Sequence, residues 1–203
     1  MISRRELIIG AGLATGAALP VARGQAALPG SGAPDRALLH RALGAIRQYR
    51  GRLGAVDRIG IVDFSQASRI ARFFLLDLNT GASRAVLVAH GRGSDPAHSG
   101  WLERFSNEPG SLASSAGAYV TGATYEGKHG RSCRLVGLDP QNSNAESRAI
   151  VVHAASYVND AMARERGKIG RSEGCFALAR ESLGPVLSHL GNGRLIYADR
   201  LIA

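Results

Sequence analysis

A short apolar run that ends in a histidine, Ala149-Ile150-Val151-Val152-His153, most constrains how this chain can fold. A continuous apolar run of this length is typical of a buried strand, so we expect His153 at the C-terminal end of one. The 203 residues include 26 glycines and only 5% aromatic side chains, which favours a turn-rich fold of short strands over a helical bundle. With 45% hydrophobic residues, the chain fits one globular domain with a sizeable core.

Periodicity and turn residues predict the elements around this strand. Apolar residues spaced by three and four predict a helix that begins after Asp35 and ends near Gly51. The other expected elements are a strand over 59–64, hairpins of 72–78 with 84–89 and of 117–125 with 132–138, a helix over 180–190 interrupted by Gly184 and Pro185, and a last strand over 194–198. The pattern predicts a mostly β domain with two helices, which fits either a mixed α+β fold or a sandwich-like one.

The first 26 residues have the features of an export signal. Arg4 and Arg5 precede a Gly/Ala-rich apolar segment, and a small-residue site follows near Gly24-Gln25-Ala26, a pattern that resembles a twin-arginine signal. The apolar part is shorter than the roughly 20 residues that span a bilayer, although an uncleaved anchor is the alternative. We therefore expect an export signal over 1–26, a linker over 27–34 and a single domain over 35–203.

The basic charge of the chain suggests an anionic polymer as its partner. The formal net charge is +9, and it stays positive without residues 1–26, which hold three arginines and one glutamate. Nucleic acid and cell wall both fit such a balance. Export argues against nucleic acid, and the arginines are scattered along the chain as on a solvated surface.

A thiol bounded by glycine follows His153 by 22 residues, in the stretch Gly170-Arg171-Ser172-Glu173-Gly174-Cys175. A cysteine attacks as the thiolate, and a free thiol with a pKa of about 8.5 is only a few per cent ionised at neutral pH, so a nearby imidazole would activate it. Gly174 lets the backbone approach a substrate, with amide N–H groups aimed at an oxyanion. A helix start directly after Cys175 would lower the pKa of its thiol. These residues predict acyl transfer.

Six motifs follow one another along the chain. They are His90-Gly91-Arg92-Gly93-Ser94, Phe105-Ser106-Asn107, Ser114-Ser115-Ala116-Gly117, Tyr125-Glu126-Gly127-Lys128-His129-Gly130, Arg148-Ala149-Ile150-Val151-Val152-His153 and Ser172-Glu173-Gly174-Cys175. Together and in this order, they resemble the murein L,D-transpeptidase catalytic domain family, in its divergent YkuD-like branch. The resemblance covers roughly residue 59 to the C-terminus. It implies a β-rich catalytic domain with an N-terminal helix and a helix after the cysteine, exported to the periplasm or facing the cell wall.

The resemblance also implies a reaction and its residues. In such enzymes the cysteine attacks the diaminopimelate carbonyl of a donor tetrapeptide, expels D-alanine and passes the acyl group to an amine of a second peptidoglycan stem. By position, Cys175 is the nucleophile, His153 the base, and Ser172 the group that orients His153. The N–H groups of Gly174 and Cys175 would hold the oxyanion. Substrate contacts would come from four further residues: Arg171, His90, Ser106 and Asn107.

Two positions depart from the family pattern. Better-known members carry histidine in place of Glu173, and an arginine or asparagine shortly after the cysteine, where this chain has Phe176-Ala177. The acceptor is therefore left open, and L,D-carboxypeptidase or another stem-peptide hydrolase activity is the alternative. A non-catalytic wall-binding module is the second alternative.

The remaining reactive side chains have simpler interpretations. Cys133 lies within an expected strand, and we expect it to pack as a small buried residue that leaves two free thiols. We expect a structural or surface role for His129 in its hairpin turn. No His-x-x-x-His or Cys-x-x-Cys pair is present, so neither a metal nor another cofactor is expected. We expect a monomer that is not inserted in a membrane after signal cleavage.

Overall fold

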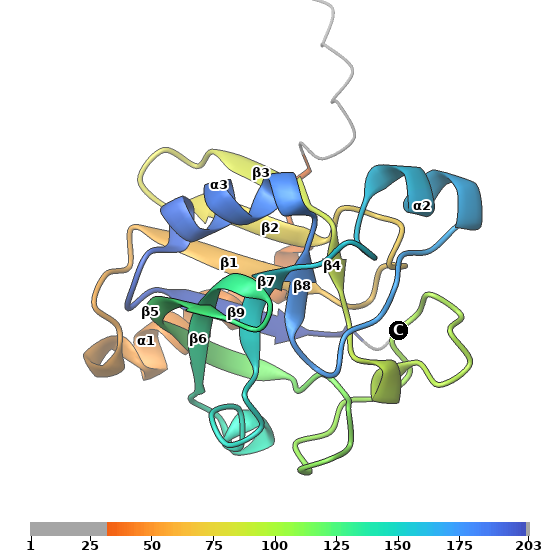
Figure 1. Cartoon of the computed structure of the whole chain (residues 1–203). Helices are drawn as coiled ribbons and strands as arrows, with labels where there is room; N and C mark the ends of the chain where they lie inside the picture. Colours follow the sequence, from red (N-terminus) through yellow and green to blue (C-terminus); the bar gives the residue numbers. More distant parts are fainter. Residues whose placement is uncertain (1–31, 202–203) are drawn as a thin grey trace, which may run out of the picture.

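Nine strands form one mixed sheet in the computed structural model, which describes residues 32–201 (Figure 1). The strands lie in the order β3-β2-β1-β9-β5-β6-β7-β8-β4. Their bounds are β1 Arg58–Asp63, β2 Phe73–Asp77, β3 Ser83–Val86, β4 Val88–Ala89, β5 Gly117–Gly127, β6 Gly130–Gly137, β7 Val151–Ala154, β8 Phe176–Leu178 and β9 Leu195–Asp199. The helices are α1 Arg36–Gln48, α2 Asp160–Arg166 and α3 Arg180–Leu190. The expected mostly β fold of the α+β class is confirmed.

The N-terminal 31 residues lie outside the described part of the chain. The export signal over 1–26 and most of the linker over 27–34 therefore stay predictions. Between residues 32 and 201, no helix is both long enough and apolar enough to cross a membrane.

Both expected hairpins form antiparallel pairs, β2 with β3 and β5 with β6. The strand expected over 84–89 is divided, because β3 ends at Val86 and β4 leaves the hairpin to pair with β8. The buried guanidinium of Arg72 binds the carbonyl of Val88 at this division, through Nε at 3.3 Å and Nη2 at 3.1 Å. The Arg72 side chain therefore supplies the hydrogen bonds that a neighbouring strand would otherwise donate to the carbonyl of Val88.

Alternate residues of the central strands bury on opposite faces of the sheet, as strand geometry requires. In β2, Phe73 and Leu75 pack in the core under α3, whereas Phe74 and Leu76 pack in the core under α1. The two helices therefore cover opposite faces (Figure 1). The expected first helix is confirmed as α1, where the Asp35 side chain accepts a hydrogen bond from the N–H of Ala37.

Two features of the helices differ from the sequence-based expectation. The third helix, α2, was not expected, although Asn159 caps its N-terminus and Gly167 ends it in the left-handed conformation. Gly184 and Pro185 do not interrupt α3. Pro185 lies in the second turn and has no N–H, so the carbonyl of Glu181 lacks its helical hydrogen bond. Glu181 is exposed, and the opposite face of α3 packs on the core.

Candidate active site

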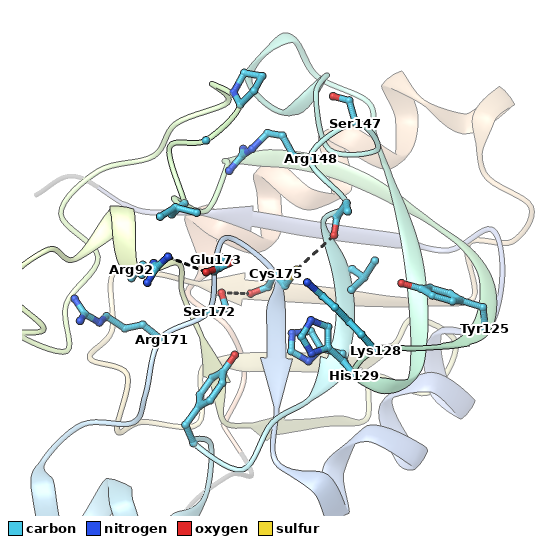
Figure 2. A pocket seen from close by; sticks show the side chains of 17 residues that line it. Arg92, Tyr125, Lys128, His129, Ser147, Arg148, Arg171, Ser172, Glu173 and Cys175 are labelled. Carbon is cyan, nitrogen blue, oxygen red and sulfur yellow. Dashed lines mark hydrogen bonds and ion pairs between the residues drawn. The ribbon is translucent and has the colours of Figure 1, made fainter.

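Cys175 and His153 lie on neighbouring parallel strands. Cys175 immediately precedes β8, and His153 lies within the buried strand β7, as expected. The register pairs His153 with Ala177, so Cys175, two residues before Ala177, projects from the same side of the sheet as His153. Both side chains line a cavity of about 640 Å³. Figure 2 shows Cys175 among the residues that line it.

The turn before Cys175 needs glycine. Gly174 has φ +114°, and a Cβ there would lie 2.7 Å from the carbonyl oxygen of Ala113. The Ser172 hydroxyl accepts a hydrogen bond from the N–H of Gly174 at 3.1 Å and donates one to the carbonyl of Cys175 at 2.7 Å. Ser172 therefore fixes the shape of the turn that presents the thiol (Figure 2).

The expectation that Ser172 orients His153 is wrong. The Ser172 hydroxyl is held within the turn, and its carbonyl accepts from the N–H of Arg92 at 2.8 Å. His153 is oriented by the residue that follows it, because its Nδ1 lies 2.9 Å from the carbonyl oxygen of Ala154. A carbonyl can only accept, so Nδ1 carries the proton and the Nε2 of a neutral His153 is free to take one.

Burial shifts both reactive groups toward their neutral forms. It raises the pKa of the Cys175 thiol, against the lowering effect of the Val151 N–H and the Lys128 charge. Burial also lowers the pKa of His153, and the charges of His129 and Lys128 act in the same direction. The Cys175 thiol lies 3.6 Å from the carbonyl oxygen of Ala149, to which it donates. The resting pair is therefore a thiol and a neutral imidazole.

Two further expectations about the thiol need correction. No helix begins directly after Cys175, because β8 comes next and α3 starts only at Arg180, so the thiol gains no helix-start charge. The N–H of Gly174 donates to Ser172 and is not free for an oxyanion. Of the two expected oxyanion donors, the N–H of Cys175 remains.

The cavity wall carries four positive side chains against one carboxylate, Glu173, and the positive ones are Arg92, Lys128, Arg148 and Arg171. The guanidinium of Arg148 is held by the carbonyls of Ser106 and Ala113 and by the Ser115 hydroxyl. That of Arg171 donates to the carbonyls of Asp95 and Pro96. Arg92 pairs with Glu173 across the opening, with Nη2 and Oε1 2.8 Å apart. Such a lining suits a ligand that carries carboxylates.

Of the four expected substrate contacts, Arg171 alone lines the cavity. His90 is buried, with Nδ1 2.8 Å from Arg72 Nη2 and Nε2 3.1 Å from Asp95 Oδ2. Ser106 and Asn107 stabilise neighbouring loops instead. The N–H of Ser106 donates to the carbonyl of Ser114, and the amide of Asn107 bonds Pro140, Ser143 and Asn144.

The hairpin turn between β5 and β6 brings residues to the cavity that sequence reasoning did not assign to it. His129 stacks on His153, with ring centroids 4.3 Å apart and an angle of 22° between the planes. Lys128, Tyr125 and Tyr157 also line the cavity. The motif Tyr125–Gly130 was the available signal, but spacing alone does not reveal that a hairpin tip reaches a thiol 47 positions later in the chain.

Cys133 is buried in β6, as expected, and burial raises the pKa of its thiol to about 11. Both cysteines are free thiols. Over residues 32–201, no group of three or more His, Cys, Asp or Glu side chains could hold a metal ion.

Comparison with known proteins places the chain in a family. A family model described as the L,D-transpeptidase catalytic domain matches residues 33–198, whereas no curated protein sequence matches the chain. Similar solved structures include L,D-transpeptidases from Mycobacterium smegmatis (12% identity, TM-score 0.44, covering 70% of this chain and 58% of that one) and Mycobacterium tuberculosis (14%, 0.44, 70% and 57%). Another is the helical cell shape determining protein Pgp2 from Campylobacter jejuni (13%, 0.44, 72% and 48%). The chain thus spans less than two thirds of these three proteins. Since the family model covers most of its length, the chain belongs to the L,D-transpeptidase catalytic domain family, as its motifs indicate.

Proposed function

We propose that this protein is a cysteine acyltransferase of the L,D-transpeptidase type that modifies or cross-links peptidoglycan stem peptides. The observation that carries the proposal is the pair of Cys175 and His153, which project from the same side of adjacent strands into one cavity. Membership of an enzymatic family supports it. The positive lining of the cavity agrees with stem peptides, which carry free carboxylates.

The reaction begins with two neutral groups. As the sulfur of Cys175 attacks the carbonyl carbon of the donor peptide, Nε2 of His153 takes the thiol proton. The N–H of Cys175 donates to the oxygen that becomes negative, and one such donor contributes about 3 kcal/mol to transition-state stabilisation in other acyl-transfer enzymes. When the C–N bond breaks, His153 gives its proton to the leaving amine and a thioester remains on Cys175.

The second half of the reaction reverses these roles. An amine of another stem peptide attacks the thioester carbonyl, and His153 takes a proton from that amine. The C–S bond breaks, the sulfur regains the proton, and a new amide links the two stems. Water in place of the amine would release a shortened stem, which is the hydrolase alternative.

We also propose the organisation of the whole chain. Residues 1–26 would direct export, residues 27–34 would link the signal to the domain, and residues 35–203 would act as one monomeric domain at the cell wall. The family match, which begins at residue 33, supports the start of this domain. Cleavage at the predicted site would be seen as the N-terminus of the protein recovered from the cell envelope.

The test is incubation of the purified protein with disaccharide-tetrapeptides, beside the Cys175→Ala variant. Cross-linked dimers are expected from the wild type, with a loss of roughly 10³-fold or more in the variant. Tripeptides without dimers would indicate the hydrolase, and binding without turnover a wall-binding module. Mass spectrometry after carbapenem treatment should find an adduct on Cys175. Turnover that survives in Cys175→Ala would refute the mechanism.

A further inference from the structure

The turn between β5 and β6 is built to present two side chains at the thiol. Gly127 pairs with Gly130 across the hairpin, which leaves Lys128 and His129 as a two-residue turn. Gly130 has φ +72°, a conformation that glycine adopts without strain. Figure 2 shows Lys128 and His129 beside Cys175, although the turn precedes the cysteine by more than 40 residues in the chain.

Contacts along the hairpin hold this turn in place. The His129 ring stacks on His153, the residue that faces the thiol from β7. Behind the turn, the Arg134 guanidinium lies 4.4 Å from the centroid of the Tyr125 ring, a cation–π contact between the two strands. The turn is therefore attached to the candidate catalytic base by a ring contact.

The cations of the cavity differ in how far protein partners occupy them. The guanidinium of Arg148 donates through both Nη atoms, that of Arg171 donates through Nη1 only, and Arg92 is paired with Glu173 through Nη2. Within residues 32–201, the ammonium of Lys128 has no hydrogen-bond or ion-pair partner. Lys128 nevertheless lines the same cavity as Cys175 and His153, and its charge acts on both of them.

We infer that Lys128 binds the carboxylate on the α-carbon of the residue that leaves the donor peptide. This inference rests on the proposed function of Cys175. In a peptide, that carboxylate lies only one residue, about 3.5 Å, beyond the carbonyl that the thiol attacks. A carbonyl held over Cys175 therefore places the carboxylate within the region that the Lys128 ammonium reaches. The pair would align the scissile bond and select donors with a free carboxylate.

The test compares two donors, a stem tetrapeptide with a free C-terminal carboxylate and the same peptide with a C-terminal carboxamide. Lys128→Gln should lower kcat/KM at least tenfold for the free acid and change it less than about twofold for the amide, because a charge-assisted contact is lost only with the acid. Lys128→Arg should retain most of the activity. Arg131→Gln removes an exposed charge that does not line the cavity, and it should affect neither donor.

Binding measurements distinguish a failure of this inference from a failure of the proposed function. Calorimetry of Cys175→Ala and of Cys175→Ala/Lys128→Gln with both peptides should give at least tenfold weaker binding of the acid, but not of the amide, to the double variant. If wild type turns over neither peptide while this difference persists, the proposed function fails, and of the inference only the binding of a C-terminal carboxylate by Lys128 stands. Equal losses for acid and amide, or no loss with either, would overturn the inference.

Discussion

The individual side chains at the site determine how the thiol is activated. Burial favours the thiol form of Cys175 and the neutral form of His153, and the Ala154 carbonyl fixes the proton of His153 on Nδ1. A preformed thiolate–imidazolium pair would require the opposite shifts. In the proposed reaction, proton transfer therefore accompanies the attack on the substrate, and His153 acts as a base in the transition state instead of a charged partner at rest.

This difference can be measured as two effects of His153→Gln. Alkylation of Cys175 by iodoacetamide should rise only at alkaline pH, since burial raises the pKa of the thiol, and the variant should leave that profile nearly unchanged. Acyl transfer to stem peptides should fall by about 10²–10⁴-fold in the same variant, because the general base is lost. Peptide mass spectrometry separates Cys175 from Cys133. Rapid alkylation of the wild type below pH 7, abolished by His153→Gln, would reveal a preformed ion pair and contradict this account.

At the scale of elements, a glycine in a strained turn and a glycine within a helix should respond in opposite ways to alanine. Gly174 has φ +114° and no room for a Cβ, so Gly174→Ala should lower the free energy of unfolding by about 1–3 kcal/mol and displace Cys175. Gly44 lies within α1, where an added Cβ would meet only Arg47 Nη2, at 3.8 Å, and Gly44→Ala should raise it by about 0.5–1 kcal/mol. Urea unfolding measures both. Equal effects at the two positions would contradict the described turn.

The elements that the sequence predicts well are those with local signals. Polar caps, glycine turns and apolar periodicity locate α1, both hairpins and the strand that carries His153. The same local signals, Asn159 before and Gly167 after, also mark α2, but its seven residues give too short a period to recognise. The sequence also predicts α3 over the residues that form it, but the interruption expected at Gly184 and Pro185 does not occur, because packing against the core outweighs one missing hydrogen bond.

The site is less predictable than the fold because its partners are distant in the chain. Family motifs identify Cys175 and His153, and the glycine turn follows from Gly174. The wrong assignments, Ser172 as the partner of His153 and His90 as a substrate contact, concern side-chain directions that depend on packing. Ser172 bonds within its own turn, and His90 faces Arg72, whose place beside it arises only when β2 and β4 enter one sheet.

Across the whole molecule, a buried chain of three polar residues connects the sheet to the cysteine loop. The Arg72 guanidinium can only donate, so it donates to Nδ1 of His90, and the proton of a neutral His90 must lie on Nε2, toward Asp95. The carbonyl of His90 then accepts from the N–H of Ser172, and the carbonyl of Asp95 accepts from Arg171. Hydrogen bonds thus connect the turn that presents Cys175 to this buried network.

The same network predicts a loss of stability in acid. Burial, followed by the Arg72 charge, lowers the pKa of His90 from 6.5 to about 4, because a second ring proton would face a guanidinium. The unfolded chain binds that proton more readily, so this stability is fully present above pH 6.5 and is lost as the pH falls toward 4. A pKa shift of one unit changes the free energy of unfolding by about 1.4 kcal/mol, so protonation of His90 lowers that free energy by about 3 kcal/mol in total.

Urea unfolding of the wild type between pH 7 and pH 4 should therefore show a falling free energy, to which the lowered pKa values of His153 and His189 also contribute. His90→Gln isolates the buried imidazole, since an amide can accept from Arg72 and donate to Asp95 but does not titrate. The free energy of unfolding of the variant should fall less steeply with pH across this range, because the variant takes up about one proton fewer when it unfolds. An unchanged pH dependence in His90→Gln would mean that His90 has the same pKa in the folded and the unfolded chain, and would contradict a neutral imidazole held between Arg72 and Asp95.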